Sequence, residues 1–247
     1  MNPSPATHQT ASSQLRILCA GAMHPIIDEL TGAIARIAGR PVAVRYASSG
    51  GVKALVMEGE PADIVITTAA AIDELGRHDK ILPLTAIAVA RSSIGVAVRA
   101  GAARLDIGSV ESFKRALRDA KSIAIADPAT ASPSGNHLIA VFDRLAMAAE
   151  LQRKIRRIGG GAGGVVVVGE AVANGEAEIG LQQIAEILAV PGLDLVGPLP
   201  PELQHVTVFS AAVAAGAADL PSARRLVAFL ASPEAAAVIR AKGMEAA

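Results

Sequence analysis

The chain has 247 residues, of which 51% are hydrophobic and only 2% are aromatic, so its core must be built from Ala, Val, Leu and Ile. This composition is typical of strands covered by helices, and the length suffices for two modest α/β lobes. The 23 basic and 23 acidic residues balance. No overall field therefore favours nucleic acid or an acidic membrane surface, and any anion must be bound by local groups.

The first residues, MNPSPATHQTASSQ, are polar and have neither the basic start nor the apolar stretch of a signal peptide. We expect a disordered tail over residues 1–14. As the sequence stands it predicts a cytoplasmic protein, whereas a trimmed or misassigned start would make it periplasmic. The sequence has no run of about 18 apolar residues, so we expect no membrane insertion.

Short β-branched runs alternate with Ala- and Leu-rich helical stretches in the first part of the chain. Parallel strands joined by crossover helices are the simplest topology for this alternation. The predicted strands are Leu15–Ala20, Val42–Ala47 and Ile64–Thr67, with helices at Ile26–Ile37 and Val52–Met57. The alternation continues with strands at Ile94–Val98, Ser122–Ala126 and Ala177–Leu181 and with helices at Val110–Asp119 and Gly135–Met147.

A glycine-rich stretch at residues 159–164 follows a basic run that ends at Arg157. A GxGxxG motif can be matched to it, but a nucleotide-binding loop should follow the first strand and open a helix. We interpret the stretch as a flexible connection and predict no nucleotide or other cofactor. The His and Cys residues show no metal-ligand spacing, so we predict no metal site.

Three predicted strands end in small polar or glycine-rich turns that open helices. Backbone N–H groups and the positive end of the helix dipole converge at such turns, which can hold an anion without a charged side chain. Each turn alone is also compatible with ordinary helix capping. The candidate ligand-binding residues in these turns are Gly21, Ala22, Met23, Ser48, Ser49, Gly50, Ser132, Ser134, Gly135 and Asn136.

Several motifs follow one another in a fixed order: the first-strand turn, Tyr46–Gly51, Gly59–Ile66, Ala126–Pro128, Gly175–Gly180 and Phe229–Ala235. In this order they resemble the molybdate-binding proteins of ABC importers over residues 15–243. The resemblance implies a two-lobed α/β fold of the type II periplasmic-binding kind, with mostly parallel sheets, acting as a monomer. It places lobe 1 at residues 15–92 plus 206–247 and lobe 2 at 93–205, a small anionic ligand between them, and an ABC permease as partner if the chain is exported.

Two departures from that family concern the ligand donors. The serine that molybdate binders place in the first turn falls at Ala22, and their tyrosine falls near Gln183. An unpaired group around a buried dianion costs about 1–3 kcal/mol. We therefore expect a site retuned from molybdate toward a carboxylate, and the amide side chains of Gln182, Gln183 and Asn136 become further candidates for ligand binding.

Two functions stay open at this point. The first is a small-anion binding protein. The alternative is a cofactor-independent isomerase that moves a proton on an unsaturated di- or tricarboxylate, because proteins similar to molybdate binders include aconitate isomerase. Such an enzyme needs a base near neutrality. His24 and His137 are the catalytic candidates, although each is equally compatible with an ordinary position at a helix start.

Overall fold

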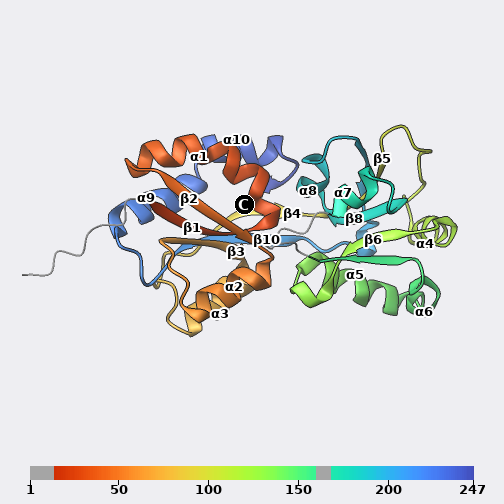
Figure 1. Cartoon of the computed structure of the whole chain (residues 1–247), viewed down its shortest axis with the longest axis horizontal. Helices are drawn as coiled ribbons and strands as arrows, with labels where there is room; N and C mark the ends of the chain where they lie inside the picture. The colour runs from red at the N-terminus through yellow and green to blue at the C-terminus, as the bar shows by residue number, and fades with distance from the viewer. Residues whose placement is uncertain (1–13, 160–167) are drawn as a thin grey trace, which may run out of the picture.

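The computed structural model describes residues 14–159 and 168–247, and it consists of two lobes that lie side by side (Figure 1). Each lobe is a sheet covered by helices. The first sheet has the strand order β11-β4-β10-β3-β1-β2 and the second has the order β7-β6-β8-β5-β9. The expected two-lobed α/β architecture is confirmed. The predicted N-terminal tail, up to residue 13, and most of the glycine-rich stretch, from residue 160, lie outside the described residues.

The first lobe combines strands from both ends of the chain, and two sets of helices cover its sheet (Figure 1). Successive side chains of β1 point to opposite faces of the sheet, and each face has its own apolar core. Ile17 and Cys19 pack under α1, α9 and α10, whereas Leu18 faces α2 and α3. Its strands are β1 (Leu15–Ala20), β2 (Val42–Ala47), β3 (Ile64–Thr68), β4 (Ile87–Ser92), β10 (Thr207–Val213) and β11 (Glu245–Ala246). Its helices are α1 (His24–Ala38), α2 (Ser49–Glu58), α3 (Ala69–Arg77), α9 (Leu220–Leu230) and α10 (Pro233–Ala241).

The second lobe has its own core, in which Phe113 and Phe142 are among the fully buried side chains. Its strands are β5 (Ile94–Arg99), β6 (Ile123–Ala126), β7 (Ile155–Ile158), β8 (Ile179–Gln183) and β9 (Leu193–Pro198). Its helices are α4 (Val110–Asp119), α5 (Pro133–Arg144), α6 (Ala148–Leu151), α7 (Val168–Ala173) and α8 (Ile184–Leu188).

Both sheets contain parallel and antiparallel strands, whereas the sequence pattern predicted successive parallel strands. In the first lobe β1, β2 and β3 are parallel, but β10 runs antiparallel to β3 and β4. In the second lobe β6 is parallel to β7 and β8, but β5 is antiparallel to β8 and β9. The antiparallel strands β5 and β10 each begin directly after the chain has crossed between the lobes, and β11 at the end of the chain also pairs antiparallel with β4.

The two crossings between the lobes lie next to each other. On one crossing a single residue, Ser93, separates β4 of the first sheet from β5 of the second, and on the other β10 begins at Thr207, which pairs with Ser92. The Gln204 side chain binds the start of β5, accepting from the Ile94 N–H and donating to its carbonyl, both at 2.9 Å. Among the described residues no helix is long and apolar enough to cross a membrane.

Candidate ligand-binding cleft

A small cavity lies between the two lobes, at the carboxyl ends of several strands. Its volume of about 30 Å³ leaves room for little more than water, so a ligand of several heavy atoms enters only when the lobes move apart. The first lobe contributes the ends of β1 and β2 together with a residue of β10, and the second lobe contributes the start of α5 and the β8–α8 junction. The lining residues are Gly21, Ala22, Ala47, Ser48, Ser49, Ser132, Pro133, Ser134, Gln183, Glu186 and Phe209.

Ser48 connects the two lobes at the edge of this cavity. It is the N-cap of α2, where its Oγ accepts from the Gly51 N–H at 3.0 Å, and the same hydroxyl donates to the carbonyl of Thr130 in the second lobe at 2.5 Å. Ser49 follows in the first turn of α2 and is buried, and its carbonyl accepts from the Thr67 hydroxyl at 3.1 Å. The Ser48 hydroxyl proton therefore joins the two lobes, and the start of α2 offers the cleft the Ser49 hydroxyl and its backbone N–H groups.

The opposite wall is formed by the start of α5, which follows β6 after the short 3-10 helix η2 (Pro128–Thr130). Ser132 and Ser134 are buried, and their hydroxyl oxygens lie 3.1 Å apart. Gly135 lets the helix start against the strand, because a Cβ at that position would lie 2.4 Å from the Ala126 carbonyl oxygen. Hydroxyl groups from both lobes thus face one small space, an arrangement suited to an anion.

Glu186 adds a carboxyl group to the same cavity, and the sequence analysis did not select it. It is the third residue of α8, whose N-cap is Gln183. The Gln183 backbone N–H and the Gln182 side chain form hydrogen bonds to the Glu186 carboxyl and lower its pKa, but burial acts more strongly and raises it to about 8. A glutamate at the third position of a helix was the one available signal, and it is typical of ordinary capping.

Residues 15–245 match the family model for bacterial extracellular solute-binding proteins. The chain belongs to this family. It is 32% identical over 237 residues to the aconitate isomerase of a Pseudomonas species, with 94% of this chain and 87% of that enzyme covered.

Two solved structures of solute-binding proteins share the fold over nearly the whole chain. The periplasmic molybdate-binding protein of Azotobacter vinelandii has a TM-score of 0.77 and 22% identity, with 93% of this chain and 98% of that one covered. The sulfate-binding protein SubI of Mycobacterium tuberculosis has a TM-score of 0.72 and 18% identity, with 94% and 86% covered. The type II periplasmic-binding fold and the resemblance to molybdate-binding proteins are confirmed.

Most of the turn residues selected from the sequence line or border the cleft of this solute-binding fold. Gly21, Ala22, Ser48, Ser49, Ser132, Ser134 and Gln183 line it, while Gly50 and Gly135 lie beside it at close backbone approaches. Met23 is instead fully buried in the core of the first lobe, and Asn136 is exposed on α5 outside the cavity lining.

The two selected glutamines are buried at the end of β8 and are occupied by protein contacts. Gln182 Oε1 accepts from the Gly169 N–H at 3.3 Å. In the orientation that satisfies both ends of its amide, Gln183 donates to Ser92 Oγ at 2.8 Å and accepts from Thr207 Oγ1 at 3.0 Å. Gln183 therefore bridges the two crossings between the lobes as well as lining the cleft.

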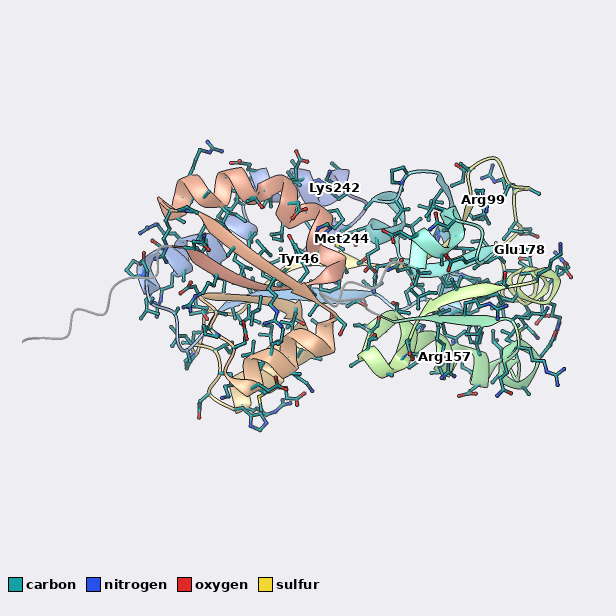
Figure 2. All side chains as sticks on the ribbon, in the orientation of Figure 1. Tyr46, Arg99, Arg157, Glu178, Lys242 and Met244 are labelled. Carbon is teal, nitrogen blue, oxygen red and sulfur yellow. The ribbon has the colours of Figure 1, made fainter. Side chains whose placement is uncertain are left out.

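The two candidate histidines do not line this cavity. His24 Nε2 lies 3.0 Å from Asp28 Oδ2, and its ring packs edge-on against Tyr46. His24 borders a separate depression together with Lys242. Figure 2 shows Lys242 at the top of the first lobe, beside the second. His137 Nε2 lies 2.8 Å from the Leu203 carbonyl oxygen, and its ring stacks on His205. Within residues 14–159 and 168–247 no three His, Cys, Asp or Glu side chains are grouped so that they could hold a metal ion.

Proposed function

We propose that this protein binds a small carboxylate anion between its lobes and isomerises it by moving a proton on an unsaturated di- or tricarboxylate. The observation that carries the proposal is the donor set of the cleft, in which Ser49 of one lobe and Ser132 and Ser134 of the other line the same space. No Lys or Arg is among the described residues that line the cavity. The anion is therefore bound by neutral hydroxyl and backbone N–H donors.

A carboxylate suits this donor set better than molybdate. Ala22 offers no hydroxyl in the first turn, and the Gln183 amide is engaged by Ser92 and Thr207, so neither replaces the donor that the resemblance to molybdate binders implies there. One planar carboxylate has two oxygens to satisfy, against four on a tetrahedral oxyanion, so the donors of the cleft suit one carboxylate group of a larger ligand. The full-length similarity to an aconitate isomerase supports a tricarboxylate and a turnover reaction.

A second candidate function is binding without turnover. The family itself, together with structural neighbours that bind molybdate and sulfate, favours this alternative. In that case the loaded protein would deliver its anion to an ABC permease. The two candidates use the same cleft and differ in whether the ligand leaves changed.

The test combines thermal shift with turnover on thoroughly dialysed protein. We expect cis- and trans-aconitate to raise the Tm and each to be converted into the other, with molybdate and sulfate giving smaller shifts. A large shift with molybdate and unchanged aconitate would favour the binding protein. The absence of a shift with any of these anions would contradict both functions.

A further inference from the structure

We infer that Glu186 is the catalytic residue that removes and returns the proton in this isomerisation, an inference that rests on the proposed function. Of the described residues around the cavity, it is the one with an ionisable side chain. It lies in the second lobe directly after β8 and lines the cavity together with serines of both lobes.

Glu186 lines the same cavity as Ala22, the residue that stands where molybdate-binding proteins have a serine. Helix α8 packs against the short 3-10 helix η1 (Gly21–Met23), and both Ala22 and Glu186 line the same cavity. Where the family resemblance implies a hydroxyl donor, this chain has a methyl group with a carboxyl group on the neighbouring element. A protonated carboxyl at that point can donate a hydrogen bond to an anion, whereas an ionised one repels it. A proton-transfer enzyme requires such a group.

Glu186 is also held in place. The N–H of Gln183 and the side chain of Gln182 hydrogen-bond to its carboxyl, as in the reciprocal capping of helix starts. These contacts fix the carboxyl relative to the helix while it borders the cavity, which is the pre-organisation that proton transfer to carbon requires.

Both protonation states of Glu186 are accessible near neutral pH. Burial raises its pKa to about 8, so the carboxyl can both accept a proton and give it back. The charged groups on the opposite side of α8 are His24, Asp28 and Glu29 of α1 and Lys242 at the end of α10, and they line the separate depression rather than the cleft. Solvent exclusion from the cleft is therefore the main cause of the shift.

The reaction balances without a cofactor. The Glu186 carboxylate takes a proton from the methylene carbon next to the substrate double bond, and the electron pair of that C–H bond forms a new double bond to the neighbouring carbon. The pair of the old double bond takes up a proton from Glu186 at its far carbon. Serine hydroxyls and backbone N–H groups stabilise the negative charge that spreads onto the substrate carboxylate during the transfer. No electron is gained or lost.

The experiment compares Glu186→Gln with wild type in aconitate turnover and in ligand-induced thermal shift. Glutamine preserves the cap, because it serves at the third helix position as glutamate does, but it cannot carry the proton. We expect isomerisation to fall by about 10²–10⁴-fold while the thermal shift with aconitate remains. Glu186→Asp should keep part of the activity. The matched control is Glu150→Gln, which breaks a surface pair with Arg118 and should leave activity unchanged.

Three outcomes separate the inference from the function on which it rests. Loss of turnover with retained binding in Glu186→Gln supports the role of Glu186. Turnover within a few-fold of wild type in that variant overturns the role and leaves the isomerase function standing. A wild-type protein that binds aconitate without converting it overturns the isomerase function and the role of Glu186 together.

Discussion

Gly50 of α2 and Ala131 of the second lobe approach so closely that a Cβ added to Gly50 would lie 2.2 Å from the Cβ of Ala131. Ala131 itself has a left-handed backbone, with a φ of 52°. The lobes thus meet through a glycine directly beside the Ser48–Thr130 hydrogen bond. The closed cleft depends on the absence of a side chain at position 50.

Gly50→Ala should therefore hold the lobes apart. The added methyl group has to displace Ala131 or open the cleft, and overpacking of this kind costs about 1–3 kcal/mol. We expect ligand affinity to fall roughly 5- to 150-fold, measured by calorimetry with aconitate. Gly32→Ala is the matched control, because a Cβ there meets nothing within 4 Å. Unchanged affinity in Gly50→Ala would show that closure at this contact is not needed for binding.

Ser48→Ala should affect both folding and binding. It removes an N-cap, which costs about 0.5–2 kcal/mol of stability, and it removes the hydroxyl that links the lobes and lines the cleft. Ser109→Ala separates the two effects, because Ser109 caps α4 in the second lobe and takes no part in the cleft lining. Urea unfolding should show similar losses for both variants. Only Ser48→Ala should weaken aconitate binding, because it removes the bond to Thr130 that joins the lobes, and equal affinities would show that binding does not depend on this bond.

The titration of Glu186 predicts a pH dependence of stability. Its pKa is raised from about 4.5 in the unfolded chain to about 8 in the folded one, so the folded state binds more protons between these values. The free energy of unfolding contributed by this group therefore falls as pH rises from about 5 to 8. Allowing for water that reaches a partly buried group, we expect wild type to lose about 1–3 kcal/mol more than Glu186→Gln over this window. Parallel pH profiles of the two proteins would contradict the shift.

The same titration predicts how catalysis responds to pH. A base must be ionised to take a proton from carbon, so kcat/KM for aconitate should rise with pH and level off above about 8. If the protein only bound the anion, with a protonated Glu186 as a donor, anion affinity would instead weaken as the pH rises through about 8. A pH–rate profile with a midpoint near 6.5 would point instead to a histidine.

The two histidines provide a direct contrast. Since neither lines the cleft, His24→Ala and His137→Ala should keep turnover within about threefold of wild type once folding is verified by thermal melting. His137 is the more sensitive of the two to folding, because it bonds the Leu203 carbonyl and stacks on His205. A loss above a hundredfold in either variant would restore that histidine as the base.

The turns that line the cleft could be predicted from the sequence because the signals that mark them are local. Ser48 stands where a β-branched run gives way to α2, and Ser134 lies in the first turn of α5 after β6 and η2. Capping preferences together with strand order place such residues at one edge of a sheet. Met23 was also selected for its place in a turn, but its long apolar side chain is stabilised in the core and leaves the cleft to its neighbours. Side-chain direction within a turn depends on packing that a sequence pattern does not encode.

Glu186 could not be selected in the same way, because its environment is made by residues distant in the chain. Its helix, α8, has only five residues and follows β8 without a turn, so no periodicity or glycine marks it. The cavity around it is completed by Gly21, Ala22 and Phe209, which lie on three other elements. The antiparallel course of β5 was missed for a similar reason, since one residue, Ser93, carries the chain from one sheet into the other.

The most direct test follows wild-type protein and Glu186→Gln with cis-aconitate by proton NMR. The vinyl and methylene signals of cis- and trans-aconitate distinguish the two acids, so conversion and binding can be observed in one sample. We predict that wild type produces trans-aconitate and that Glu186→Gln binds the acid but converts it at least about a hundredfold more slowly. An unchanged cis-aconitate spectrum with wild type, in a sample that molybdate or sulfate stabilises strongly, would contradict the account.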